Sequence, residues 1–164
     1  MKITESRIEN LEEILSIIHN AIIDMESENI YQWDDIYPDR RTVISDINNQ
    51  SLYVYFDEFV IKGIIAFDER QEKEYETINW RYGTGRQLII HRLCVDPKYK
   101  KQGIARSLVA FAEQFGKMNG FESIRLDSFV DNIRACKLYL MGGYDAIGIV
   151  NFRKGKFICF EKKL

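Results

Sequence analysis

The sequence predicts one α+β domain, residues 1–164, built on a mixed, mostly antiparallel sheet of about seven strands with about four helices around it. Runs rich in β-branched and aromatic residues alternate with amphipathic segments at helical spacing. Two apolar runs, residues 88–95 and 122–127, are joined through such a helical segment, which predicts a parallel pair with a right-handed crossover. Hydrophobic residues make up 46% and charged residues 29% of the chain, as in globular proteins that bury a core.

The N-terminal part of the chain predicts a strand followed by two helices. Residues 2–8 alternate weakly and suit a strand. Asn10 is suited to cap a helix that runs to about Met25, and Pro38 is suited to the start of a second helix that ends near residues 48–49. The apolar side chains at helical spacing on the first helix are Leu11, Ile14, Leu15, Ile18 and Ile22.

The middle of the chain predicts a β-hairpin and a charged connection. Residues 52–56 and 59–67 are rich in β formers and are separated by a short turn. Residues 69–76 carry many charges and are expected to form an exposed connection. The run 80–86 contains two glycines, which indicates a turn or an irregular start of the strand at 88–95.

The C-terminal part predicts two further helices and three further strands. The expected elements are a helix over 103–117, a strand over 123–127, a helix over 131–141, and strands over 144–150 and 157–160. Each of the two helices is followed by glycine, which readily adopts the left-handed conformation that ends a helix.

A short basic loop, Lys100-Lys101-Gln102-Gly103-Ile104-Ala105, lies between the strand at 88–95 and the helix that follows it. A helix N-terminus presents unpaired N–H groups and partial positive charge, and glycine lets a backbone approach an anion closely. The loop therefore suggests a phosphate-binding site for a nucleotide cofactor. An ordinary basic turn without a ligand is the alternative that the loop alone leaves open.

Composition and charge exclude several classes of protein. The net charge of −2 gives no electrostatic reason to expect nucleic acid as a partner. Cys94, Cys136 and Cys159 are widely spaced without a C-x-x-C pair, so they are expected to be reduced, buried thiols rather than metal ligands. The sequence shows neither a signal-peptide core nor an apolar run that could span a bilayer, and a cytoplasmic protein with no membrane partner is expected.

Two segments of the chain resemble motifs of the GNAT acyltransferases. Val95-Asp96-Pro97, followed by Tyr99 to Ala105, resembles the acetyl-CoA loop of that family, Gln/Arg-x-x-Gly-x-Gly/Ala. The segment from Asn132 to Tyr144 resembles the family's Asn-x-x-Ala-x-x-Leu-Tyr-x-x-x-Gly-Phe pattern. The two motifs lie at the family's usual separation, and the predicted element order is similar to the family's fold along the whole chain.

The resemblance implies an N-acetyltransferase that uses acetyl-CoA, without a metal, to acetylate a primary amine of a small molecule or a peptide. It implies that the parallel strand pair splays apart to admit the pantetheine arm. It also implies that Tyr139 is the general acid that reprotonates the CoA thiolate. The implied cofactor-binding residues are Leu93, Cys94 and Val95 in the strand, Lys100, Lys101, Gln102, Gly103, Ile104, Ala105 and Arg106 in the loop, and Asn132 beside the arm.

The sequence departs from the family pattern in two places. Lys100 stands where the family has Gln or Arg, which removes a planar hydrogen-bonding group but leaves the backbone contacts of the loop unchanged. Ile89 stands where the family often has a glutamate base. His91 is then the first candidate for the base, because imidazole titrates in the useful range and its position resembles that of a histidine in arylalkylamine acetyltransferases. A water relay, with His91 in a structural role, is the alternative, and Tyr139 has the alternative of a core tyrosine.

The acceptor site is expected between the first two helices and the strands that face them. Trp33 and Tyr37 are the first candidates to line it, with Trp80 and Tyr82 as further ones. The acidic residues expected at its rim, which would suit a cationic amine, are Asp24, Glu26, Glu28, Asp34 and Asp35. An acidic surface loop without a ligand is the alternative.

Two other functions compete with the enzyme. A non-catalytic module that binds acyl-CoA as a sensor or scaffold would share the loop but need neither acid nor base. Another nucleotide-binding βαβ protein is less favoured, because the sequence has neither G-x-G-x-x-G after its first strand nor G-x-x-x-x-G-K-[ST]. A homodimer formed through the aromatic C-terminal strands is an option that the family resemblance leaves open.

Overall fold

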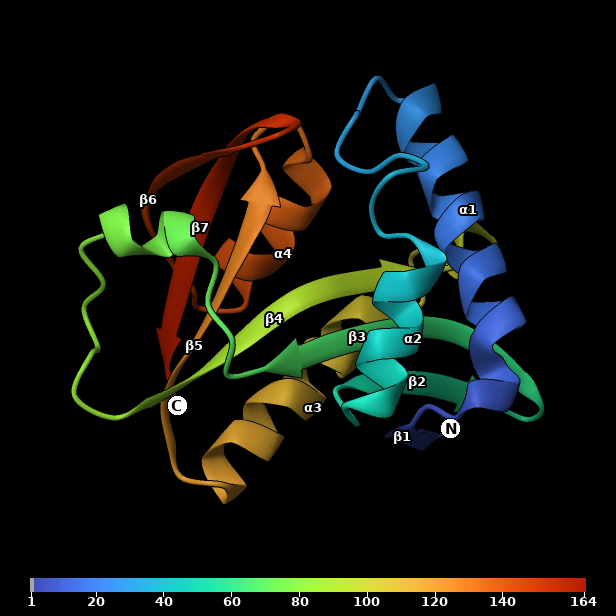
Figure 1. The fold of residues 1–164 in the computed structure, drawn as a ribbon, viewed down its shortest axis with the longest axis horizontal. Coiled ribbons are helices and arrows are strands. Elements are labelled where there is room, and N and C mark those ends of the chain that lie inside the picture. Colours follow the sequence, from blue (N-terminus) through green and yellow to red (C-terminus); the bar gives the residue numbers. More distant parts are fainter. Residues whose placement is uncertain (1) are drawn as a thin grey trace. The chain divides into compact units, whose positions relative to one another are not determined.

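The computed structural model describes residues 2–164, which form a seven-stranded mixed sheet with four α-helices (Figure 1). The strand order is β1-β2-β3-β4-β5-β7-β6. The strands are β1 (Lys2–Glu5), β2 (Leu52–Asp57), β3 (Val60–Asp68), β4 (Arg86–Val95), β5 (Phe121–Phe129), β6 (Asp145–Phe152) and β7 (Gly155–Lys163). The helices are α1 (Leu11–Ser27), α2 (Arg40–Asn48), α3 (Ile104–Met118) and α4 (Ile133–Met141), with 3-10 segments η1 (Ile8–Asn10), η2 (Lys73–Thr77) and η3 (Pro97–Tyr99). The predicted fold class is confirmed.

Strands β4 and β5 pair in parallel, as predicted. Its register runs from Arg86 opposite Phe121 to Ile90 opposite Leu126. Strand β5 also pairs with β7 in antiparallel register, and β7 pairs with β6. Parallel strands need a long connection, and α3 supplies it here. The splaying expected beyond this paired stretch stays a prediction.

Two compact units can be distinguished in the chain. The first consists of Met1–Phe67 with Arg92–Phe111, and the second of Asp68–His91 with Ala112–Leu164. Strand β4 and helix α3 each contribute residues to both units. The single domain expected over residues 1–164 stays a prediction.

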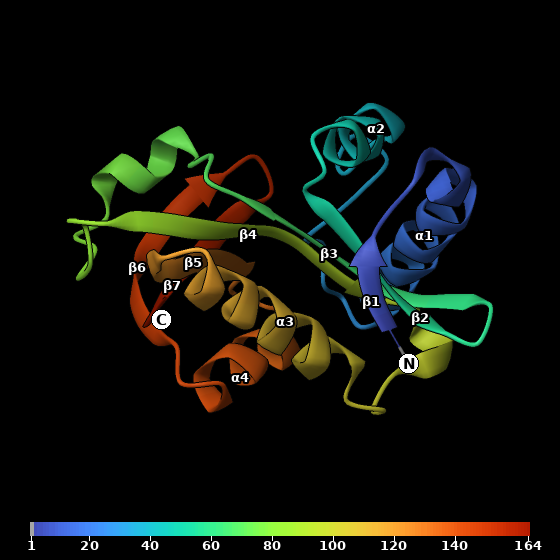
Figure 2. The same cartoon turned by 90° about the horizontal axis from the view of Figure 1, so that it is seen from below.

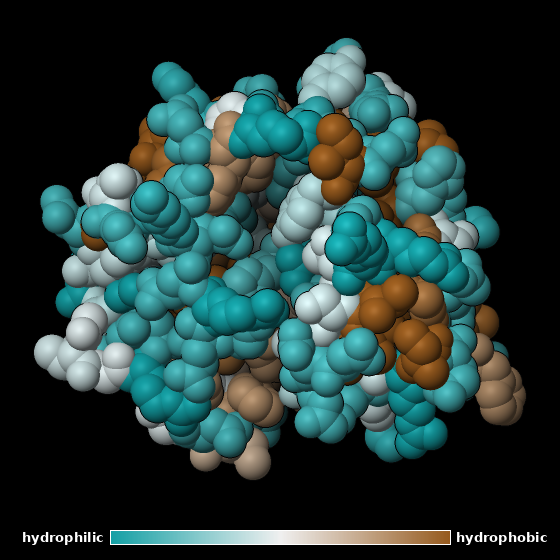
Figure 3. Space-filling view, in the orientation of Figure 1, coloured by the Kyte–Doolittle hydropathy of each residue, from teal (hydrophilic) through white to brown (hydrophobic). Residues whose placement is uncertain are grey.

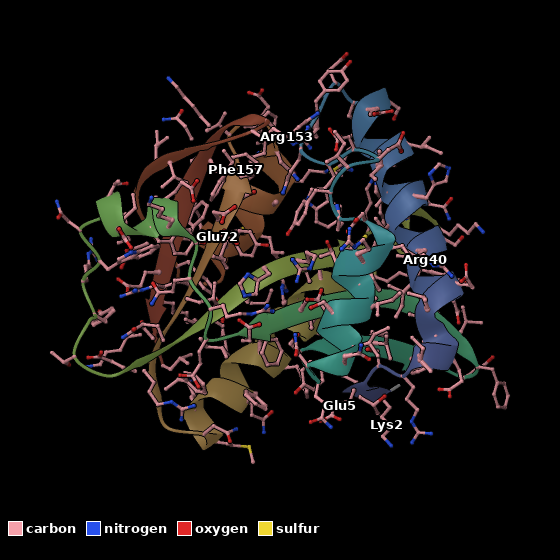
Figure 4. The ribbon with its side chains drawn as sticks, viewed as in Figure 1. Lys2, Glu5, Arg40, Glu72, Arg153 and Phe157 are labelled. Carbon is pink, nitrogen blue, oxygen red and sulfur yellow. The ribbon has the colours of Figure 1, made fainter. Side chains whose placement is uncertain are left out.

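In the first unit, α1 is held by its apolar stripe and by two acids near its N-terminus. Ile14 and Ile17 are almost completely buried. Glu12 forms an ion pair with Arg40 of α2, which Figure 4 labels, and Glu13 accepts a hydrogen bond of 2.8 Å from the Ile61 N–H. The expected capping role of Asn10 is wrong in one respect, because its side-chain oxygen accepts from the Arg7 N–H at 2.9 Å and closes η1 instead.

In the second unit, α4 and η2 lie on opposite faces of strands β5, β7 and β6 (Figure 2). This division follows from the alternation of side chains along β5. Leu126 is buried on the face of α4, whereas Arg125 turns toward the segment that carries η2, where its guanidinium lies 4.3 Å from the centre of the Trp80 ring.

The connection between β3 and β4 is more ordered than its charges predict. Residues 69–76 were expected to be simply exposed, yet they contain most of η2, and Tyr75 is only 2% exposed. Arg125 binds this segment through the Gln71 side chain at 2.8 Å and the Tyr82 carbonyl oxygen. The sequence pattern could not predict this, because the anchoring arginine lies on a strand much further along the chain. Figure 3, in the orientation of Figure 1, shows mostly hydrophilic residues over η2.

Among residues 2–164, no helix combines the length and the apolar character that crossing a bilayer requires.

Candidate active site

The loop before α3 presents a row of unpaired backbone amides. Lys101 and Gly103 have positive φ angles of 62° and 79°. Among residues 2–164, the N–H groups of residues 101–106 have no hydrogen-bond partner, and the helical ladder starts with the bond of 3.0 Å from the Ser107 N–H to the Gly103 oxygen. A Cβ on Gly103 would meet no atom within 4 Å, so the loop is open on that side. These features fit a pyrophosphate group, as the resemblance implies.

The start of α3 is held close to the sheet by a glycine. A Cβ on Gly63 of β3 would lie 2.9 Å from the Cys94 carbonyl oxygen and 3.2 Å from side-chain atoms of both Ile104 and Leu108. A contact of 2.9 Å with a backbone atom essentially never occurs at a real Cβ, so glycine permits this close approach. The end of β4 and the first turns of α3, which flank the loop, are therefore both packed closely against β3.

The side chain of Lys100 is bound to α1. Its Nζ atom forms an ion pair with Asp24 and lies 3.7 Å from a carboxylate oxygen of Glu28. This explains how the loop accommodates a lysine at the position where the family has Gln or Arg: the cation is held by protein carboxylates. Two of the five acids expected at the acceptor rim are therefore paired with a lysine rather than presented alone.

The end of β4 has its side chains packed into the first unit. Cys94 is 4% exposed, and its Sγ atom lies 3.9 Å from the Ile17 carbonyl oxygen of α1. Burial raises the pKa of the Cys94 thiol to about 12, so the thiol is protonated and a poor nucleophile at neutral pH. Leu93 and Val95 are half-buried. The backbone contacts expected of these residues stay a prediction.

The two aromatic residues first expected to line the acceptor site have different surroundings. Trp33 is only 7% exposed and belongs to the core of the first unit. Tyr37 is more open, and its hydroxyl accepts a hydrogen bond of 2.6 Å from Arg92. Arg92 in turn binds both carboxylate oxygens of the buried Asp46, at 2.8 and 2.6 Å. The segment that contains Tyr37 is thus attached to β4 and α2.

In the second unit, the ring of Tyr139 is buried while its hydroxyl remains available. The residue is 5% exposed, and its ring packs against those of Tyr144 and Phe160 at centroid distances of 5.8 and 5.6 Å. Among residues 2–164 the hydroxyl has no hydrogen-bond partner. Its oxygen is nevertheless not among the completely buried side-chain atoms that lack a partner, so it remains accessible. Burial, with the nearby charge of Asp127, raises the pKa of Tyr139 above its ordinary value.

Asn132 caps the helix that carries Tyr139. Its Oδ1 atom accepts from the Ala135 N–H at 3.2 Å, and its backbone N–H donates to the Phe129 oxygen at 2.9 Å. This geometry is a common reason for asparagine at a helix start. The cap fixes the first turn of α4, and a contact of Asn132 with the cofactor arm stays a prediction.

His91 is held by a carboxylate from the end of β3. Its Nε2 atom lies 2.8 Å from Oδ1 of Asp68, and its side chain is 9% exposed. Burial opposes the ionisation of Asp68, but hydrogen bonds from His91 and Arg70 outweigh it, so the pKa of Asp68 lies well below its ordinary value. Because an ionised carboxylate only accepts, Nε2 carries the proton and Nδ1 of neutral His91 is the basic nitrogen. Among residues 2–164, Nδ1 has no hydrogen-bond partner.

Asp127 completes this group of titratable side chains and was not found by the sequence reasoning. Its Oδ2 atom accepts a hydrogen bond of 2.8 Å from the Tyr75 hydroxyl. Burial raises the pKa of Asp127 to about 6, although Tyr75 and His91 act in the opposite direction. An acid that ends an apolar strand was the available signal in the sequence. Its partner Tyr75 gave none, because it lies in a run of charges that predicts an exposed connection.

The second unit thus brings together an imidazole, a phenol and a carboxyl group. His91, Tyr139 and Asp127 are close enough for the charge of Asp127 to affect the pKa of Tyr139, and for His91 to affect that of Asp127. Perturbed groups with free polar atoms are typical of catalytic centres. Among the described residues 2–164, no group of three or more His, Cys, Asp or Glu side chains could hold a metal ion.

Comparisons with known proteins agree with this fold. The family model described as the acetyltransferase (GNAT) family matches residues 14–143. No curated protein matches the chain. A protein from Staphylococcus aureus Mu50 assigned as an acetyltransferase is 26% identical, with a TM-score of 0.80 and 99% of both chains covered.

Two further solved structures share the fold at lower identity. A GNAT-family acetyltransferase from Streptococcus agalactiae 2603 is 20% identical, with a TM-score of 0.87 over 99% of this chain and 95% of that one. The PaiA N-acetyltransferase from Thermoplasma acidophilum, solved in complex with coenzyme A, is 18% identical, with a TM-score of 0.75 over 99% and 98% of the two chains. Because the family model matches most of the sequence, the chain belongs to the acetyltransferase (GNAT) family.

Proposed function

We propose that the protein is an acetyl-CoA-dependent N-acetyltransferase that acetylates a primary amine of a small molecule or a peptide by direct attack. The observation that carries the proposal is the Tyr139 hydroxyl, which lies on a buried ring without a protein partner in the same unit as the Asp68–His91 pair. A module that only bound acyl-CoA would need neither the free hydroxyl nor the free imidazole nitrogen.

The loop of residues 100–106 would hold the pyrophosphate of acetyl-CoA through its backbone. The unpaired N–H groups and the N-terminal end of α3 supply donors and partial positive charge. Lys100 would contribute little, since Asp24 and Glu28 already bind it. Acetyl-CoA, when bound, would supply the acetyl group as a thioester.

His91 would act as the base and Tyr139 as the acid. Most alkylamines are ammonium ions at neutral pH, so Nδ1 of His91 would first take a proton from the acceptor nitrogen. A C–N bond then forms as the C–S bond breaks, and the Tyr139 hydroxyl gives a proton to the departing sulfur. The acceptor nitrogen loses two protons in all: one replaces the proton that Tyr139 gave up, and the other leaves through His91 to water.

The raised pKa of Tyr139 is compatible with this role. Burial raises its pKa, and burial likewise raises the pKa of the Cys159 thiol of β7, to about 12. The same desolvation would make a thiolate beside Tyr139 more basic than it is in water. The weaker acidity of the buried phenol is then offset by the greater basicity of the thiolate, so the proton transfer is about as uphill as the ordinary pKa values suggest.

The test is incubation of the protein with acetyl-CoA and a panel of primary amines, with the free thiol measured over time. Amine-dependent release of thiol, together with mass-spectrometric detection of the N-acetyl product, is expected. Tight binding of CoA by isothermal titration without turnover of any amine would contradict the proposal and favour an acyl-CoA-binding sensor or scaffold.

A further inference from the structure

The segment between β3 and β4 inserts one hydroxyl against the sheet. The Tyr75 ring packs at 5.0 Å from the Trp80 ring, whose Nε1 donates to the Tyr75 carbonyl oxygen at 3.0 Å. Trp80 is covered in turn by the guanidinium of Arg125, which is fixed by the buried Glu161 at 2.9 Å. Trp80 therefore contacts both the ring and the backbone of Tyr75, and the Tyr75 hydroxyl donates to Asp127.

Asp127 keeps one oxygen free after this contact. Tyr75 occupies Oδ2, and among residues 2–164 Oδ1 has no hydrogen-bond partner. Five other groups affect or sense its charge. They are Glu72, which precedes η2, Glu74 within η2, His91 of β4, Tyr139 of α4 and Cys159 of β7. Only His91 among these can carry a positive charge, so the surroundings of Oδ1 favour a cation. Figure 4 labels Glu72, at the start of η2.

We propose that Asp127, held by the Tyr75 hydroxyl, binds the ammonium group of the acceptor beside His91, and that the acceptor is an amine with no carboxylate next to its reacting nitrogen. This rests on the proposed acetyltransferase function and names its substrate class. Asp127 is the binding group, whereas Tyr75 is a positioning residue that acts through Asp127.

The arginines of this segment support the exclusion of an α-carboxylate. Arg70 binds Asp68 at 2.7 Å, and Arg86 forms an ion pair with Glu69. Arg81 binds Asp145 at 2.6 Å. Each arginine between residues 68 and 91 is thus committed to an acid, and none is left over for a substrate carboxylate. A free amino acid would bring an anion toward Asp127, Glu72 and Glu74, and no arginine of this segment is available to pair with it.

The ionisation of Asp127 gives the first test. Its carboxyl carbon is observed by ¹³C NMR across a pH titration of the wild-type protein, Tyr75→Phe and Glu72→Gln. Removal of the Tyr75 hydrogen bond raises the pKa of Asp127, and removal of the Glu72 charge lowers it. Glu76→Gln removes an exposed charge from the same segment, is not among the groups that act on Asp127, and is expected to leave the titration unchanged. A titration that does not respond to Tyr75→Phe would overturn the positioning role.

Acceptor binding and turnover give the second test. Alaninamide and alanine are compared as acceptors with the wild-type protein and Asp127→Asn, which keeps an oxygen for Tyr75. Alaninamide is expected to bind and react, alanine to do so at least tenfold less well, and Asp127→Asn to raise the KM for alaninamide at least tenfold with unchanged CoA binding. Alanine accepted as readily as alaninamide, or a KM unchanged in Asp127→Asn, would overturn the proposal.

The failure of this inference can be separated from the failure of the proposed function. Binding of alaninamide to the CoA-loaded protein is measured by calorimetry, independently of turnover. Binding that depends on Asp127 without release of thiol would leave the ammonium site standing and contradict the acetyltransferase. Thiol release that is the same in wild type and Asp127→Asn would leave the acetyltransferase standing and contradict the ammonium site.

Discussion

Nε2 of His91 lies 2.8 Å from Oδ1 of Asp68, which connects the middle of β4 to the last residue of β3. Asp68 also accepts hydrogen bonds from the backbone N–H and the side chain of Arg70, both at 2.7 Å. The carboxylate is thereby kept ionised and oriented, and it determines which nitrogen of the imidazole carries the proton. A neutral His91 then presents Nδ1 as its basic atom.

Tyr139→Phe is expected to lower turnover by roughly 10²-fold, the usual scale for the loss of a general acid. The ring packing against Tyr144 and Phe160 is retained in the variant, so the affinity for CoA should not change. Turnover is followed by thiol release and affinity by isothermal titration. Equal turnover in both proteins would remove Tyr139 from the mechanism.

Gly103→Ala is expected to weaken CoA binding and to destabilise the protein by ~1 kcal/mol, the usual cost of an L-residue in the left-handed region. Gly103 has φ of 79°, and relief of this strain would turn the loop amides away from an anion. Gly120→Ala is the matched control, because Gly120 has φ of 72° and an equally open side, but lies at the far end of α3.

Both glycine variants should lose similar stability in urea denaturation, whereas only Gly103→Ala should lose affinity for CoA in calorimetry. The loop would not be the pyrophosphate site if the two variants bound CoA equally well.

Asp68→Asn is expected to lower the free energy of unfolding at pH 7 by ~2 kcal/mol, a typical contribution of hydrogen bonds to a charged group. The pKa of Asp68 is depressed in the folded protein, so its contribution to stability is complete above its unfolded pKa of about 4 and is lost as the pH falls below that value. The difference between wild type and variant should therefore shrink between pH 5 and pH 2. Denaturant titrations at several pH values measure it, and a constant difference would contradict the ionised carboxylate.

Arg92→Met is expected to destabilise the protein by about 3–5 kcal/mol, because it leaves the buried carboxylate of Asp46 without its partner. Asp46 is 2% exposed and Arg92 is 7% exposed. The double variant Arg92→Met with Asp46→Leu should lose less than the sum of the two single variants, since it buries no unpaired charge. Urea denaturation of the four proteins closes the cycle, and strictly additive losses would be inconsistent with a coupled pair.

The sequence by itself determined the order and type of the main elements. Helical spacing from Leu11 onward and the β-rich runs around residues 52–67 predicted α1 and the β2–β3 hairpin, because these patterns depend on neighbours along the chain. Two family motifs could likewise be recognised from the sequence, because each is a contiguous segment. They are the basic loop with Gly103, and the segment in which Tyr139 follows Asn132 by seven residues.

Only the tertiary structure decided which side chains meet. Asp68 pairs with His91 across 23 residues, Tyr75 with Asp127 across 52, and Lys100 with Asp24 across 76. No periodicity specifies such pairs, because each depends on the registers of separate strands and helices. The charges near Tyr75 predicted exposure, yet Arg125, itself paired with Glu161, binds the same segment from a distant strand, and the Tyr75 hydroxyl donates to Asp127. The sequence shows that an acid, Asp127, ends an apolar strand, but it does not show which side chains surround that acid.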